Sequence, residues 1–359
     1  MAPIQPRIPC AINRWGDVSQ PCLTPHRLSI HLQHHSMIQP IKMSDESSTP
    51  QNDSMISIGS HSLFVSVTGL PHTNGDPPIV FIPGNGDVAT SFAAVERAIK
   101  CFATVVLYDR TGLGRSEDAP TPTNPTAVSS AIELHTLLSN AGLTSPVILA
   151  AHSYGGIIAR EFLHLYPDHV AGMVLIDAAS ERNRHLFETP NLDLLAVFGG
   201  LDYARVTGLR DRSKLTRDEW RTRAIGMARG LKTGQAEATG GIPICKTLEE
   251  KKQYLTRPLG SKPLSVVGCN STGDYRKLFD KAVEAGNGTE EQREAYRQLL
   301  EVWVEHEREW QEEQVQLSSN ARFVHLPDCG HHVQILRPDV VAEEIRWVRE
   351  QVLKRAGKL

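Results

Sequence analysis

The feature that most constrains the fold is a short apolar run that leads directly into Ser153. Residues 147–151 have the composition of a buried strand, and the apolar spacing of residues 155–166 is that of a helix. Ala151 and Gly155 stand two residues before and two residues after the serine, and small residues there let a strand and a helix approach closely around a tight turn. The sequence therefore predicts a strand, a sharp turn and a helix, with the Ser153 side chain held exposed at the turn.

Strand and helix signals alternate over most of the chain. Short apolar, mostly β-branched runs predict strands at 62–67, 79–82, 104–108, 147–151, 172–176, 264–267 and 322–326. Helices are predicted at 89–100, 125–141, 155–166 and 339–354. This alternation predicts an α/β fold, with a doubly wound and mostly parallel sheet.

Two segments interrupt the alternation. Residues 181–260 lack a convincing core strand, and helix signals fall instead at 192–198, 217–229 and 248–254. This segment is therefore predicted to be a helical cap, or lid, inserted between the core segments 55–180 and 261–359. Residues 274–317 are highly charged, and their sparse apolar positions fit one buried face of a solvated helix; these positions are Leu299, Val302, Trp303 and Trp310.

The first 54 residues differ from the rest in their many prolines and weak apolar periodicity. Residues 1–54 are therefore predicted to be a disordered N-terminal extension, and Met43 offers an alternative start that would make residues 1–42 dispensable. The arginine-bearing, acid-poor opening is similar to a mitochondrial targeting peptide, but its prolines interrupt an amphipathic helix. A cytoplasmic location is expected, with targeting by the extension left open.

Composition excludes several classes of function. Hydrophobic residues make up 40% of the chain, enough for a large core, and the net charge of −3 gives no electrostatic case for binding nucleic acid. No apolar run approaches the roughly 20 residues of a membrane span. The six cysteines include no C-x-x-C pair, so neither a zinc site nor a disulfide framework is expected. No metal or organic cofactor is expected, and the oligomeric state is not predicted.

Separate motifs, in the right order, resemble those of the α/β-hydrolase superfamily. Ala-His-Ser153-Tyr-Gly resembles its Gly-x-Ser-x-Gly nucleophile elbow, with Ala151 in place of the first glycine. Gly330 and His331 follow the last predicted strand, where these proteins carry a Gly-His pair. The resemblance covers residues of about 60–357, and it implies that Ser153 is a nucleophile and His331 its base.

Two carboxylates are candidates for the acid that orients His331. Asp177 ends the predicted strand at 172–176, which puts it at the carboxyl edge of the sheet next to the nucleophile. Asp274 follows the next predicted strand, the one that more often bears the acid in the superfamily, but at a longer spacing than usual. Either could instead have a local role, since an aspartate at position 274 could cap the helix that follows. Asp177 is preferred, and Asp274 is kept as the alternative.

The resemblance also implies an oxyanion hole. One donor is the backbone N–H of Tyr154, directly after the nucleophile, and the second is Asn85 in the loop after the strand at 79–82. Pro83 replaces the histidine that usually supports this loop in the superfamily. The segment 109–116 resembles the superfamily's Asp-x-x-Gly-x-Gly-x-Ser loop, and Asp109 and Arg110 are expected to build that turn.

These residues together predict a serine hydrolase that cleaves a small-molecule carboxylic ester, lactone or thioester by acyl transfer. Relatives that open epoxides or remove halides carry aspartate at the elbow, so Ser153 argues against both reactions. The alternative is a non-hydrolytic protein of the same fold, such as a ligand receptor or a catalyst of cyclisation or carbon–carbon bond cleavage. The chain also resembles hydrolases of filamentous fungi, some from secondary metabolism. The expected partner is a small-molecule acyl substrate.

Overall fold

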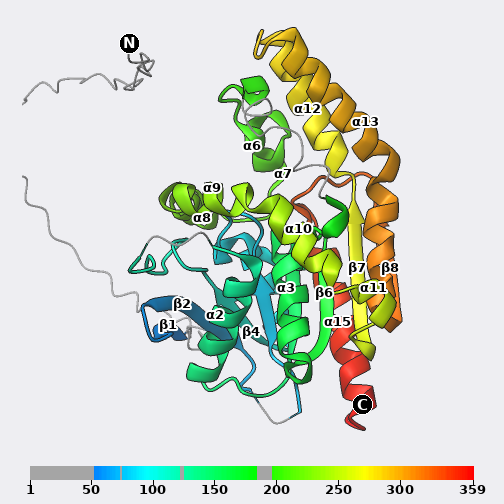
Figure 1. The fold of residues 1–359 in the computed structure, drawn as a ribbon. Helices are drawn as coiled ribbons and strands as arrows, with labels where there is room; N and C mark the ends of the chain where they lie inside the picture. The colour runs from blue at the N-terminus through cyan, green and yellow to red at the C-terminus, as the bar shows by residue number, and fades with distance from the viewer. Residues whose placement is uncertain (1–51, 73–74, 122–124, 184–195) are drawn as a thin grey trace, which may run out of the picture. The chain divides into compact units, whose positions relative to one another are not determined.

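The computed structural model describes residues 52–72, 75–121, 125–183 and 196–359 (Figure 1). These residues contain an 8-stranded sheet of order β1-β2-β4-β3-β5-β6-β7-β8. The strands are β1 (Asn52–Ser57), β2 (Ser62–Gly69), β3 (Ile79–Ile82), β4 (Thr104–Tyr108), β5 (Val147–His152), β6 (Val170–Ile176), β7 (Gly260–Cys269) and β8 (Ser318–Leu326). β2 pairs antiparallel with β1 and β4, and all other pairs are parallel. The predicted doubly wound, mostly parallel α/β fold is confirmed.

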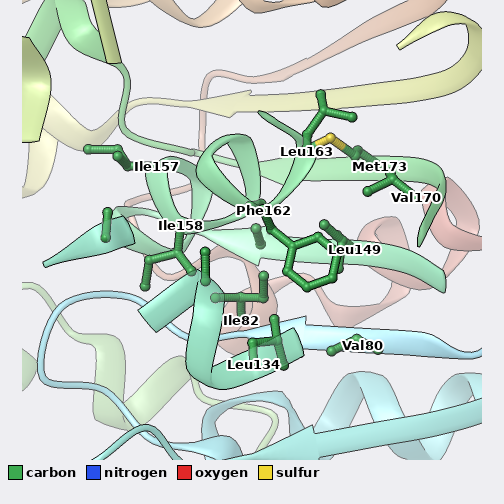
Figure 2. Packing of buried hydrophobic residues seen from close by; sticks show 14 of the residues in the cluster. Val80, Ile82, Leu134, Leu149, Ile157, Ile158, Phe162, Leu163, Val170 and Met173 are labelled. Atoms are coloured by element: carbon green, nitrogen blue, oxygen red, sulfur yellow. The ribbon is translucent and has the colours of Figure 1, made fainter. Parts of the chain in front are cut away.

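Helices cover both faces of the sheet (Figure 1). α2 (Ala127–Asn140) and α3 (Tyr154–Leu165) pack on one face, while α1 (Ala93–Ile99) and α15 (Pro338–Arg355) pack on the other. Figure 2 shows the first of these layers, in which Phe162 of α3 lies among Leu134 of α2 and Leu149 of β5. The central strands are buried on both faces, which explains their continuous apolar sequences.

The segment between β6 and β7 is helical where it is described. Its helices are α6 (Tyr203–Val206), α7 (Leu209–Arg212), α8 (Arg217–Arg229), α9 (Leu231–Thr239), α10 (Gly241–Glu250) and α11 (Gln253–Thr256). The prediction at 217–229 coincides with α8, and most of the one at 192–198 lies outside the described residues. The helix predicted at 248–254 is instead split between α10 and α11, because Lys252 takes a left-handed conformation with φ of 49°. α10 contributes Ile244 and Leu248 to the same core cluster as α3.

Two predictions at the margins need correction. Asn52–Ser54, assigned to the disordered extension, begin β1, because they pair in register with Val65–Val67 at the edge of the sheet. Residues 1–51 lie outside the described residues. β7 also begins earlier than predicted, at Gly260, because its first residues pair with β8.

The charged segment before β8 forms two helices that lie side by side, α12 (Ser271–Glu284) and α13 (Glu290–Glu313) (Figure 1). Tyr296, Leu299 and Leu300 of α13 are buried, and Phe279 of α12 stacks on Tyr296. Val302 was predicted on the buried face but is 42% exposed, because it lies on the opposite side of the helix from Leu300. Among the described residues, no helix is long and apolar enough to cross a bilayer.

Candidate active site

Ser153 occupies a strained turn between β5 and α3. Its φ of 52° and ψ of −125° lie in a region that residues with a side chain rarely adopt. A Cβ at Gly155 would lie 2.2 Å from the carbonyl oxygen of Ile82, and one at Gly156 would lie 2.4 Å from Cβ of Ala178. Glycine is therefore required where α3 crosses the ends of β3 and β6, and the crossing holds Ser153 at the carboxyl edge of the sheet.

The structure brings Asp177 and His331 together, from the ends of β6 and β8. His331 Nδ1 donates to Asp177 Oδ2 at 2.6 Å. The other carboxylate oxygen, Oδ1, accepts from Gln311 Nε2 at 2.8 Å, and Ser271 Oγ also donates to Oδ2. Asp177 is itself strained, with φ of 40°. Two donors besides the imidazole, Ser271 and Gln311, therefore hold this buried carboxylate against His331.

This pairing shifts the pKa of both groups. Burial alone lowers the pKa of His331, but the hydrogen bond and the charge of Asp177 outweigh it, so the pKa is raised above its usual 6.5. Burial alone raises the pKa of Asp177, but the hydrogen bond and charge of His331 and the Ser271 hydroxyl outweigh it, so the pKa is lowered. Asp177 is thus held ionised next to an imidazole that readily accepts a proton.

Asp274, the alternative acid, contacts the backbone of His331 and not its ring. Its Oδ2 accepts from the His331 N–H at 3.1 Å and from the Tyr203 hydroxyl at 3.0 Å. A Cβ at Gly330 would lie 1.9 Å from this same oxygen, so glycine leaves room for the carboxylate. Asp274 fixes the loop that carries His331, whereas Asp177 contacts the imidazole.

His152, directly before Ser153, contacts His331 through the backbone. Its Nε2 lies 2.9 Å from the carbonyl oxygen of His331, and its Nδ1 lies 3.3 Å from Gln334 Nε2. Burial, with a smaller contribution from the nearby His331, lowers the pKa of His152 to about 3. His152 is therefore neutral, donates through Nε2 and accepts through Nδ1.

Asn85 and Tyr154, the predicted oxyanion donors, line the same cavity as Ser153. Within the described residues, the backbone N–H groups of Asn85 and Tyr154 donate to no other group. The loop is supported by Arg110, which donates to the carbonyl oxygens of Pro83 and Gly84 at 2.7 Å each. Arg110 thus reaches the loop where Pro83 replaces the superfamily's histidine. Asp109 builds its own turn, accepting from the N–H groups of Ala89 and Arg115.

A cavity of about 610 Å³ opens in front of these groups. Its lining includes Ser153, Tyr154, Asp177 and His331. Much of its lining comes from α13, which contributes residues at helical spacing: Tyr296, Leu299, Leu300, Trp303, Glu307, Trp310 and Gln311. Within the described residues, Ser153 Oγ makes no hydrogen bond to His331, although both side chains line the cavity. Such contacts are often long without substrate.

Two comparisons with known proteins decide the family. The model of the alpha/beta hydrolase family matches residues 79–344. An AB hydrolase superfamily protein of Gibberella zeae is 30% identical over 298 residues, which span 80% of this chain and 90% of that protein. The chain belongs to the alpha/beta hydrolase family.

Other proteins are similar to this α/β hydrolase over different shares of their own length and at different levels of identity. The probable transporter efuK of Hormonema carpetanum is 30% identical over 301 residues, which span 83% of this chain but only 42% of that protein. A putative lipase, lip1, of Acinetobacter baumannii has the same fold, with a TM-score of 0.61 at 17% identity over 85% of this chain and 93% of that one. A putative epoxide hydrolase of Pseudomonas aeruginosa shares the fold at a TM-score of 0.59 and 12% identity.

One cluster in this α/β hydrolase has the composition of a metal site. Asp87, His152 and His332 place one potential ligand atom each within 4.8 Å of one another. Arg223 Nε lies 3.2 Å from Asp87 Oδ1, and both ring nitrogens of His152 already have partners. The guanidinium already supplies the positive charge there, so these residues do not fit a metal ion.

Sequence reasoning missed the residues that surround Asp177 and the cavity. Ser271 begins α12, and Gln311 and Glu307 lie in the charged segment interpreted as a solvated helix. Burial, followed by the charge of Asp177, raises the pKa of Glu307 to about 7. The spacing of Tyr296, Trp303 and Trp310 at multiples of seven was the available signal for a buried face, although it does not say what that face contacts.

Proposed function

We propose that this α/β hydrolase is a serine hydrolase that cleaves a small-molecule carboxylic ester, lactone or thioester through an acyl-enzyme. The observation that carries the proposal is the partly buried 2.6 Å hydrogen bond between Asp177 and His331, next to a serine held in a strained elbow. An acid, a base and a nucleophile on the ends of β6, β8 and β5 are the parts that acyl transfer needs.

In the proposed reaction, His331 Nε2 accepts the proton of Ser153 Oγ as the oxygen attacks the substrate carbonyl carbon. The carbonyl π electrons move to the oxygen, and the N–H groups of Asn85 and Tyr154 donate to the resulting oxyanion. Collapse of this tetrahedral intermediate breaks the bond to the leaving group, which takes the proton from His331. Water, deprotonated by His331, then attacks the acyl carbon, and Ser153 regains its proton as the acid is released. Asp177 stays ionised throughout and stabilises the imidazolium.

The side chains that line the cavity favour a substrate with an apolar group. The cavity wall on α13 carries aromatic and aliphatic side chains, and α10 of the cap contributes Ile244 from the other side. Residues 181–260 are accordingly proposed to be a lid over the core formed by 55–180 and 261–359. A role in secondary metabolism stays a prediction.

Labelling and turnover test this function together. Wild-type protein should react with a fluorophosphonate probe and hydrolyse p-nitrophenyl esters, and Ser153→Ala should lose both. The matched control is Ser66→Ala, since Ser66 is a buried serine of β2 whose hydroxyl has no partner in the described structure. A wild-type serine that is neither labelled nor active on any ester or thioester would contradict the proposal and favour a receptor or another non-hydrolytic role.

A further inference from the structure

Arg110 and Glu237 form a buried ion pair between the core and α9 of the proposed lid. Arg110 Nε donates to Glu237 Oε1 at 2.7 Å, and Arg110 Nη2 donates to Oε2 at 3.0 Å. The two side chains are 3% and 1% exposed. Because a buried guanidinium without a counter-charge is strongly destabilising, α9 supplies a carboxylate that Arg110 needs in order to occupy this position.

Arg110 also controls the direction of a catalytic N–H. The Gly84 carbonyl and the Asn85 N–H belong to one planar trans peptide unit, so they point in opposite directions. Arg110 Nη2 donates to the Gly84 oxygen at 2.7 Å, and the Asp87 N–H donates to it at 3.2 Å. These bonds fix the plane of the peptide and so the direction of the Asn85 N–H. A carbonyl that accepts a hydrogen bond also polarises its peptide, which makes the N–H a stronger donor.

Glu237 holds the other end of the same loop. Its Oε2 accepts from the Gly86 N–H at 2.8 Å and from Asn85 Nδ2 at 3.2 Å. Asn85 Nδ2 also donates to the carbonyl oxygen of Gly234 in α9 at 2.9 Å. A Cβ at Gly234 would lie 3.0 Å from the Gly86 Cα, so the helix and the loop meet backbone to backbone. The Arg110–Glu237 pair therefore binds the backbone on both sides of Asn85, at the Gly84 carbonyl oxygen and at the Gly86 N–H.

We propose that Glu237 is a positioning residue for the oxyanion hole: with α9 docked, it holds Arg110 and Gly86 so that the Asn85 N–H points at the developing oxyanion. The lid then does more than cover the substrate, because its docking completes the catalytic apparatus. This inference rests on the proposed function, since it assigns a role within the same reaction.

The test compares Glu237→Gln with a matched control, Glu181→Gln. Glu181 also pairs with a buried arginine, Arg160, at 2.5 Å, and within the described structure it makes no hydrogen bond to the oxyanion loop. Glu237→Gln should lower kcat on p-nitrophenyl esters by about 10- to 100-fold with KM changed less than about threefold, because only the transition state carries the oxyanion. Affinity for a trifluoromethyl ketone, which forms an oxyanion adduct, should fall by the same factor. Glu181→Gln should keep wild-type kcat and inhibitor affinity.

A double variant separates positioning from folding. Arg110→Gln with Glu237→Gln removes both buried charges, so its thermal stability should recover above that of Glu237→Gln while kcat and inhibitor affinity stay low. Recovery of kcat in step with stability would overturn the proposal, as would a rise in KM alone or equal losses in Glu181→Gln. Wild-type protein without esterase activity or probe labelling would instead refute the proposed function, and that result is visible before any variant is made.

Discussion

The two candidate acids give the sharpest test of the site, because one exchange, aspartate to asparagine, has different consequences at each. At position 177 the amide oxygen is expected to stay opposite Gln311 Nε2, which also donates to the carbonyl of Cys269 at 3.0 Å and so cannot turn. The amide NH₂ then faces His331 Nδ1. A donor at that point stabilises the imidazole tautomer with its proton on Nε2, which cannot accept the proton of Ser153.

We therefore expect Asp177→Asn to lower kcat/KM by about 10⁴, which corresponds to roughly 5.4 kcal/mol of transition-state stabilisation. Asp274→Asn keeps an oxygen that can accept from the His331 N–H or from the Tyr203 hydroxyl. It should cost about 1–2 kcal/mol of stability and no more than about tenfold in kcat/KM.

Steady-state hydrolysis of a p-nitrophenyl ester measures both effects, and circular dichroism with chemical denaturation reports folding. A loss at position 274 as large as that at position 177, in folded protein, would refute the assignment of Asp177 as the orienting acid. So would a variant Asp177→Asn that keeps more than about a tenth of wild-type activity.

Three further outcomes are expected. Because His331 must be neutral to act as a base and its pKa is raised, kcat/KM should fall as the pH is lowered, with a midpoint above the ordinary 6.5; a profile flat from about pH 8 to pH 5 would contradict this. Trp303→Ala should enlarge the cavity, so the ratio of kcat/KM for an ester two methylenes longer to kcat/KM for the shorter ester should rise by about tenfold, at roughly 0.8 kcal/mol per buried methylene. Val302→Ala, which changes an exposed residue on the same helix, should leave this ratio unchanged. Phe162→Ala should lower the free energy of unfolding by about 3–5 kcal/mol in urea titrations, with the partly exposed Leu165→Ala as the control that loses under about 1 kcal/mol.

The local geometry around Ser153 and His331 could be predicted from the sequence. The elbow at Ser153 depends on a few adjacent residues, and the small residues predicted around it, Ala151 and Gly155, can be read from the sequence alone. The need for glycine at position 156 depends on a contact with Ala178, which lies far along the chain. His331 could likewise be placed from the strand that precedes it and the Gly-His pair. Both predictions rest on short-range geometry, and both residues line the same cavity.

The sequence favoured Asp177 but left Asp274 open, because β6 and β7 are neighbours and both carboxylates reach the same edge of the sheet. What separates them is a set of contacts from distant segments, with Ser271 and Gln311 gathered around Asp177. The role of α13 was missed for a related reason. An amphipathic pattern shows that one face is buried, but it does not say whether that face meets a core, another helix or a substrate cavity.

α13 both lines the cavity and carries Gln311, whose amide holds Asp177. The same helix presents Trp303 and Trp310 to the cavity and the amide that holds Asp177. Under the proposed function, we expect a change in this helix that admits larger substrates to disturb the Gln311 amide and its hydrogen bond to Asp177 as well. We therefore expect substrate range and turnover to be coupled, so that variants selected for larger substrates recover their turnover through compensating changes around Gln311.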